Sequence, residues 1–229
     1  MNHSDSDGSP PEDHREPADE FDWSEFAWER YLREQDQAVV DYWRSYVQIG
    51  PRADRIDEVA RQLGWAPESD MAEDTETDEI QEEFEEDDFE PYTVHRNNVF
   101  VATRAIFAGL QALLERFGCD SAKLPADVAI PLAGALHRAE VMAVLGVQAL
   151  DLSDRALGIS QLKRALAELN QAFGRLPAAP ATGEPSTPAQ EFSLLVLPLL
   201  FDLREIFLRV SAECRADLEH PAGEDDEPF

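Results

Sequence analysis

The chain has 229 residues, which is enough for one large domain or two small ones with a buried core. Its formal net charge of −29 argues against direct binding to nucleic acid or to anionic membrane surfaces, because both depend on Lys and Arg side chains. Two cysteines, Cys119 and Cys214, are too few for a small domain stabilised by disulfides.

The excess negative charge is confined to three segments. Residues 67–93 contain 14 Asp or Glu and no Lys or Arg, whereas residues 94–216 contain 12 acidic and 12 basic residues. Segments so polar cannot bury enough apolar surface to fold. We therefore predict disordered acidic tails at 1–22 and 219–229 and a disordered acidic linker at 66–93.

Features of export or membrane insertion are not visible in the sequence. The N-terminal residues show neither a basic region nor an apolar stretch typical of a signal peptide. No uncharged apolar run reaches the roughly 18–20 residues that a membrane span requires. We expect a cytoplasmic protein with reduced thiols and no membrane insertion.

Residues 23–65 predict a helical hairpin. Apolar residues recur at helical spacing from Ser24, a suitable N-cap, to Gly50, and a shorter helix follows and ends at Gly64. All four tryptophans of the chain lie in this region. Its aromatic side chains either dock the hairpin on the rest of the chain or form a partner-binding surface, since Trp and Tyr dominate interface hot spots. The candidate partner-binding residues here are Trp23, Phe26, Trp28, Tyr31 and Trp43.

The acidic linker contains a second group of candidates. Phe84, Phe89 and Tyr92 are interspersed with carboxylates, a composition typical of segments that become ordered on a basic partner with apolar grooves. The alternative is a solvated linker whose aromatic residues have no partner outside the chain.

Residues 94–218 predict a bundle of four long helices. Short connections favour antiparallel neighbours, and a Pro-rich connector at 177–187 precedes the last helix. The predicted helices span about 94–117, 125–152, 154–175 and 188–218. The sequence therefore predicts an all-α fold: an antiparallel four-helix bundle with the N-terminal hairpin docked on it.

The helix over residues 125–152 is apolar on nearly every side. Its charges are limited to Asp127, Arg138, Glu140 and Asp151. Because a helix of this kind must be covered all round, we expect it to be the central helix of the bundle.

His137, Arg138 and Glu140 form the one local feature that resembles a site. His137 and Glu140 are three residues apart and share a helix face, so they are weak candidates for metal ligands. A carboxylate-bridged di-metal bundle needs Glu-x-x-His on two helices, which residues 94–218 lack. The alternative is structural: Arg138 or Glu140 pairs with a charge on another helix, and His137 bonds to a neighbour or reaches the surface. The possible partners are Glu205, Arg204, Arg104 and Arg209.

The sequence supports two main hypotheses for function. The first is a non-catalytic interaction protein whose acidic arms and aromatic hairpin engage a protein partner, with a basic one favoured. The second is a metal-binding helical bundle or an enzyme with a site around His137 and Glu140. Self-association into a homo-oligomer is also open, because apolar surface on the bundle helices would suit a second copy. No nucleophile, phosphate-loop or dinucleotide motif is present, so we predict no cofactor.

Overall fold

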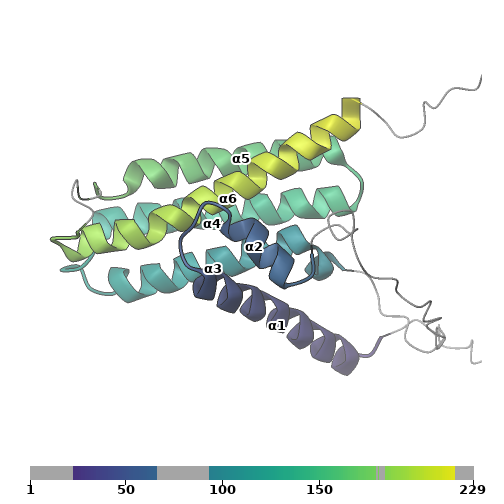
Figure 1. Cartoon of the computed structure of the whole chain (residues 1–229), viewed down its shortest axis with the longest axis horizontal. Helices are drawn as coiled ribbons and strands as arrows, with labels where there is room; N and C mark the ends of the chain where they lie inside the picture. The colour runs from purple at the N-terminus through teal and green to yellow at the C-terminus, as the bar shows by residue number, and fades with distance from the viewer. Residues whose placement is uncertain (1–22, 66–92, 179, 181–183, 220–229) are drawn as a thin grey trace, which may run out of the picture. The chain divides into compact units, whose positions relative to one another are not determined.

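The computed structural model describes residues 23–65, 93–178, 180 and 184–219. Every regular element in these ranges is a helix, and none is a strand. The elements are α1 (Glu25–Ile49), α2 (Arg55–Gln62), the short 3₁₀ helix η2 (Val94–Arg96), α3 (Asn98–Gly118), α4 (Ala126–Asp151), α5 (Arg155–Arg175) and α6 (Pro188–Glu219) (Figure 1). The all-helical fold class is confirmed for the described residues. The predictions of disordered tails and linker fall almost entirely outside them.

The chain divides into two compact units between Glu34 and Gln35, within α1. The described part of the smaller unit is 23–34. Its helix begins at Ser24, whose hydroxyl oxygen accepts the backbone N–H of Ala27 at 3.2 Å, as the predicted N-cap requires. The larger unit contains the rest of α1 and all other helices.

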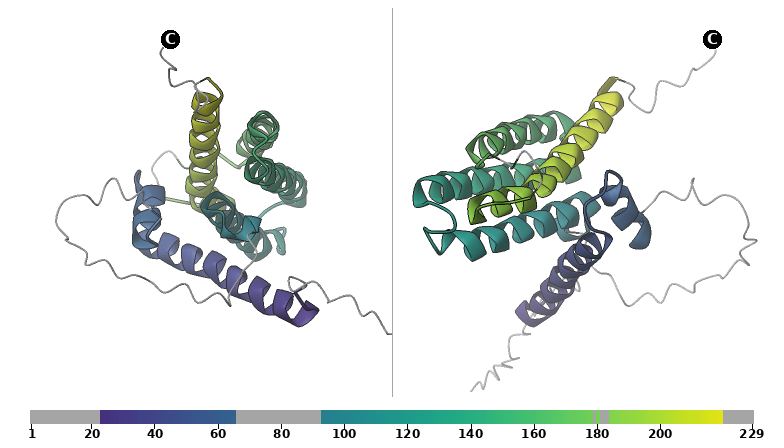
Figure 2. Two further views of the ribbon diagram at one scale, coloured as in Figure 1. Left: turned by 90° about the vertical axis from the view of Figure 1, so that its right-hand side faces the viewer. Right: turned by 60° about the vertical axis from the view of Figure 1, so that its left-hand side comes forward.

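Helices α3 to α6 pack around a common core. Each contacts its neighbours in chain order, and α3 also contacts α6. Phe117 near the end of α3 lies 5.5 Å, between ring centroids, from Phe192 near the start of α6, so these two helices run antiparallel. Similar end-to-start contacts relate α4 to α5 and α5 to α6 (Figures 1 and 2). The packing contacts are consistent with the predicted bundle.

Glycines allow α4 and α5 to approach closely. A methyl group on Gly158 of α5 would lie 2.7 Å from Cγ of Leu150, and one on Gly146 of α4 would lie 3.2 Å from Leu162. Small residues at both positions bring the helix backbones together and add dispersion contacts along the seam. Figure 2 shows α5 lying along α4.

The core of the larger unit is built from aliphatic and aromatic side chains of several helices. Leu132, Leu162, Leu200 and Phe207 are fully buried. Burying one such side chain contributes about 1.5–3 kcal/mol. The two cysteines are not joined by a disulfide: Cys119 is exposed just after α3, and Cys214 is buried near the end of α6.

The expectation that α4 is covered on every side is wrong. Only 39% of its most apolar stretch is buried, and Ile130 and Leu152 are 72% and 82% exposed. Helices α3 and α5 cover two sides, and the side between them is open to solvent. By length and composition alone, α4 is also the one helix of the described residues that could span a membrane.

Residues 35–65 contact the bundle within the larger unit through aromatic side chains. The Trp43 indole lies against α3 at Gly109, where a methyl group would stand 2.6 Å from Cζ2 and closer still to the ring atoms beside it. Glycine at this position therefore lets the ring reach the helix backbone. Tyr42 and Trp65 stack with ring centroids 5.5 Å apart, which ties the end of this segment to α1.

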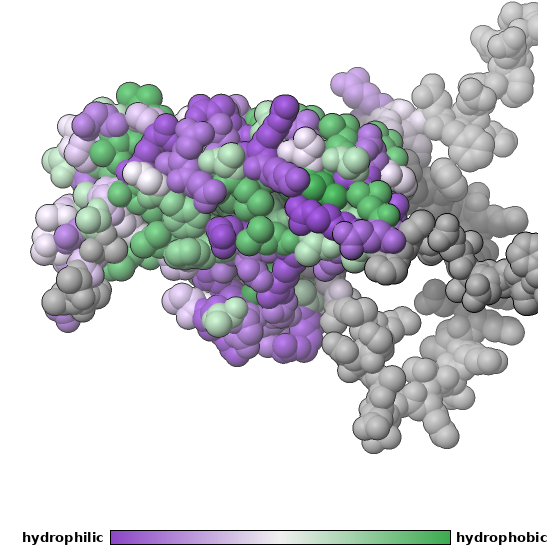
Figure 3. Space-filling model, turned by 90° about the horizontal axis from the view of Figure 1, so that it is seen from above, coloured by the Kyte–Doolittle hydropathy of each residue, from purple (hydrophilic) through white to green (hydrophobic). Residues whose placement is uncertain are grey.

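Apolar side chains also reach the surface near α5 and α6. Phe201 of α6 is 56% exposed and rests on Phe173 of α5, with ring centroids 4.9 Å apart. Figure 3 views the molecule from above Figure 1 and shows a band of apolar surface between polar residues. The bundle thus leaves more than one apolar area uncovered within the described residues.

Candidate functional site

Glu140, in the middle of α4, is the buried carboxylate that the sequence singled out. Its side chain is 7% exposed. Arg104 of α3 donates through Nη1 to Oε1, and Gln111 of α3 donates through Nε2 to Oε2 at 2.9 Å. Residues 104 and 111 lie two helical turns apart on one side of α3, so they reach Glu140 together. Both carboxylate oxygens are satisfied, as a buried charge requires.

His137 and Arg138 are not part of this ion pair. His137 is exposed, and Arg138 donates through Nη2 to Oε2 of Glu168 on α5 at 2.8 Å. This hydrogen bond raises the pKa of the exposed Arg138 guanidinium above its usual range. The two charged neighbours in sequence thus pair with different helices, Glu140 with α3 and Arg138 with α5.

The structure does not bring His137 and Glu140 into a common ligand set. Within the described ranges, no group of three or more His, Cys, Asp or Glu side chains is arranged to hold a metal ion. Each oxygen of Glu140 already accepts a hydrogen bond, from Arg104 or Gln111, so a metal ion would share this carboxylate with both donors.

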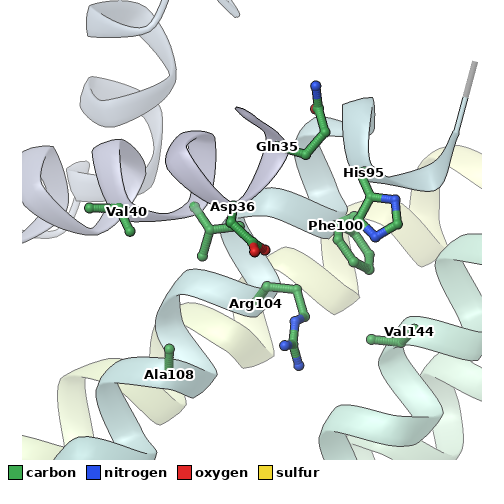
Figure 4. A pocket seen from close by; sticks show the side chains of 9 residues that line it. Gln35, Asp36, Val40, His95, Phe100, Arg104, Ala108 and Val144 are labelled. Atoms are coloured by element: carbon green, nitrogen blue, oxygen red, sulfur yellow. The ribbon is translucent and has the colours of Figure 1, made fainter. Parts of the chain in front are cut away.

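A cleft of about 400 Å³ opens beside the Glu140 ion pair. Arg104 joins the two features, because the same side chain lines the cleft and bonds to Glu140. In Figure 4, Asp36 on α1 and Arg104 on α3 extend into the same space. The His95 ring stands nearly edge-on to Phe100, with centroids 5.1 Å apart. The lining residues are Gln35, Asp36, Val39, Val40, His95, Phe100, Arg104, Ala108 and Val144.

The cleft has few groups that could take part in covalent chemistry. Its nine lining residues include no Ser, Thr, Cys, Tyr or Lys, so it offers no conventional nucleophile other than the Asp36 carboxylate and the His95 imidazole. The guanidinium of Arg104 is already engaged by Glu140. Mostly apolar walls with a few polar groups suit a small amphipathic group, such as a protruding side chain of a partner.

A second polar cluster, centred on Asp202 of α6, was not predicted from the sequence. Its Oδ2 accepts Tyr46 Oη at 2.6 Å, and Arg55 Nε and Nη2 at 2.9 and 2.5 Å. The Arg55 guanidinium also lies over the Tyr46 ring, 3.8 Å from its centroid. Asp202 is the one carboxylate between Phe192 and Leu203, an otherwise uncharged stretch of α6, and this was the available signal. The cluster ties α1 and α2 to α6.

Burial strongly affects the two tyrosines near Asp202. Desolvation is the largest cause that raises the pKa of Tyr46 above its ordinary value, followed by the hydrogen bond to Asp202. Desolvation also raises the pKa of Tyr42, with the charge of Asp202 as the second cause. The Tyr42 hydroxyl is buried and has no hydrogen-bond partner among the described residues. Both phenols therefore stay protonated at pH values well above those at which an exposed tyrosine ionises.

The aromatic candidates of the predicted hairpin have different environments. In the smaller unit, Trp23, Trp28 and Tyr31 form a cluster with ring centroids 5.2–6.0 Å apart. Tyr31 is buried, whereas Phe26 is 79% exposed. In the larger unit, Trp43 is packed against Gly109. The linker candidates Phe84, Phe89 and Tyr92 lie outside the described residues.

Comparisons with models of known protein families, with curated proteins and with solved structures find no match for this chain.

Proposed function

We propose that this chain is a non-catalytic helical interaction protein that binds a protein partner, most favourably a basic one. The observation that carries the proposal is the aromatic surface of residues 23–34. There Phe26 projects into solvent beside the cluster of Trp23 and Trp28. Large exposed aromatic side chains are costly to leave in water and are the usual anchors of protein interfaces.

The charge of the chain supports a basic partner. A net charge of −29 attracts a positively charged protein over distances of about a Debye length and speeds its encounter. The aromatic residues would then supply the short-range contacts that hold the complex. On this view the acidic segments and the aromatic surface have successive roles in binding.

The alternative, a metal site or active site around His137 and Glu140, has less support. The hydrogen bonds of Glu140 to Arg104 and Gln111 give the carboxylate a structural role that links α3 to α4. Elemental analysis of the purified chain tests this alternative directly. A stoichiometric transition metal that is lost in a Glu140→Gln variant would favour it over the interaction proposal.

The proposal is tested by affinity capture with the full-length chain from an extract of its native cell. Captured proteins are compared between wild type and Phe26→Ala. Val47→Ala is the matched control, because Val47 is an exposed apolar residue of the same helix. We expect a basic protein whose capture is lost with Phe26→Ala, retained with Val47→Ala and weakened by salt.

A deletion of residues 68–90 separates the two parts of the proposal. Capture that is reduced by the deletion supports a role for the acidic segment. Undiminished capture excludes that role and leaves the aromatic surface alone. Equal capture by wild type and Phe26→Ala contradicts the proposal as a whole.

A further inference from the structure

The outer side of α4 carries an apolar stripe with no charged residue between its ends. Its members follow one another at intervals of three or four residues, so they share one side of the helix. All of them are exposed to solvent. Its apolar members are Ile130, Ala133, Val141 and Leu145, with the polar His137 and Gln148 between them, and Leu152 follows directly after the end of α4.

Two ion pairs border the stripe at mid-helix. Glu140 pairs with Arg104 on the α3 side, and Arg138 pairs with Glu168 on the α5 side. Each pair has no net charge, and both of its members lie on helices of the bundle. An apolar centre with a satisfied polar rim is the usual anatomy of a protein interface.

We propose that a second copy of this chain covers the stripe, with two α4 helices packed face to face across a two-fold axis. Covering this surface with an identical one buries no charge on either side. The bundle region, residues 94–216, has equal numbers of acidic and basic residues, so the repulsion between two copies of net charge −29 comes from segments outside the bundle and is screened by salt. The stripe has no charged side chain with which a charged partner could pair.

The distribution of side-chain sizes favours an antiparallel pairing of the two helices. The stripe is small at Ala133 and large at Leu145. A two-fold axis near the middle of α4, between His137 and Val141, brings the small end of each helix opposite the large end of the other. In such an isologous interface every contact is repeated by the two-fold axis, and the large residues of each copy fill the space left by the small residues of the other.

The size of the stripe sets the expected strength of association. From Ile130 to Leu152 the helix side is about 33 Å long and roughly 10 Å wide, or on the order of 330 Å² in projection. A stable interface buries about 800 Å² of accessible surface on each partner. Side chains of α3 and α5 beside the stripe must contribute the remainder, so we expect a dimer with a micromolar dissociation constant.

Sedimentation of the full-length chain over a range of concentrations tests the proposal. Val141→Glu puts a charge in the middle of the stripe, and Leu208→Glu is the matched control. Val141 is 38% exposed on α4, and Leu208 is 37% exposed on a different helix, α6. We expect Val141→Glu to raise the dissociation constant by roughly tenfold or more and Leu208→Glu to leave it unchanged. Far-ultraviolet circular dichroism shows that each variant folds.

A wild-type chain that stays monomeric at several hundred micromolar overturns the proposal, as does equal weakening by both variants. Phosphatidylcholine vesicles test the other occupant that an apolar helix suggests. If the chain binds these vesicles and Val141→Glu abolishes the binding, lipid rather than a second copy covers the stripe. The outcome is independent of the interaction proposed for Phe26, which lies on a different element and is measured by capture of another protein.

Discussion

The fit between Trp43 and Gly109 depends on the absence of a single methyl group. We predict that Gly109→Ala destabilises the protein by about 1–3 kcal/mol, because the added carbon overlaps the far edge of the indole and forces the ring to move. Gly118→Ala in the same helix is the control, since its methyl group would make an ordinary 3.6 Å contact with Ala129. Urea unfolding measures both effects. If Gly109→Ala costs as much in a Trp43→Ala background as in wild type, the ring is not the cause.

Tyr42 and Tyr46 give a matched pair of substitutions at neighbouring buried positions. We predict that Tyr46→Phe costs about 1.5–3 kcal/mol of stability, because it removes a hydrogen bond to the Asp202 carboxylate. Tyr42→Phe should leave the stability unchanged or raise it by up to about 1 kcal/mol, since the buried Tyr42 hydroxyl has no hydrogen-bond partner among the described residues. Thermal denaturation of the two variants and of wild type measures both changes in stability. Equal losses would show that the Tyr42 hydroxyl has a partner after all.

The residues around Glu140 show how far local sequence can predict a site. The sequence indicated that Glu140 needs a partner and included Arg104 among the possibilities, and the structure confirms this pair. It did not indicate Glu168 as the partner of Arg138. The need for a partner follows from the cost of burying a charge. The choice of partner depends on helix rotation and register, which residue types alone do not determine.

At the level of elements, Asn97 determines where α3 begins. The sequence placed this helix start near Val94, but η2 comes first and the α-helix begins after Asn97. The Asn97 side chain accepts the backbone N–H groups of Val99 and Phe100 and donates to Asp151 at the end of α4. One side chain thus caps one helix and ties it to another.

We predict that Asn97→Ala destabilises the protein by about 1–2 kcal/mol, because it removes the cap and the bond to α4 together. Asn98→Ala is the control, since Asn98 is exposed and alanine is the better helix former. Chemical denaturation of both variants provides the comparison. A neutral Asn97→Ala would mean that the helix start is held by other contacts.

The helix boundaries were otherwise predictable, and the position of α4 was not. Capping residues and periodic apolar residues mark the other helix ends to within a few positions, as Ser24 does for α1. The apolar composition of a helix such as α4 indicates only that exposing its sides to water is unfavourable. Whether its own chain or another molecule provides the cover depends on how the remaining helices are arranged. For α4, the glycine seam with α5 covers one side closely and leaves another open.

For the molecule as a whole, the raised pKa values of Tyr42 and Tyr46 predict a loss of stability in alkali. Both tyrosines have an ordinary value of 10.0 that folding raises. Above pH 10.0 the unfolded chain loses these protons while the folded chain keeps them, so stability that is fully present below this pH declines as pH rises. Each tyrosine contributes a slope of about 1.4 kcal/mol per pH unit. The slope should fall by this amount in Tyr46→Phe, measured by urea unfolding at a series of alkaline pH values. An unchanged slope would contradict the linkage.

The four tryptophans, all between residues 23 and 65, make α1 and α2 separately observable by optical methods. Helices α3 to α6 contain no indole, so intrinsic fluorescence reports on the environment of the N-terminal helices alone. Far-ultraviolet circular dichroism is dominated by α3 to α6 together, because they contain 21, 26, 21 and 32 residues against 25 in α1 and 8 in α2. Recording both signals during one melt therefore shows whether the N-terminal helices detach before the bundle loses its helicity. Coincident curves would mean that the indole packed on Gly109 makes them a single cooperative unit.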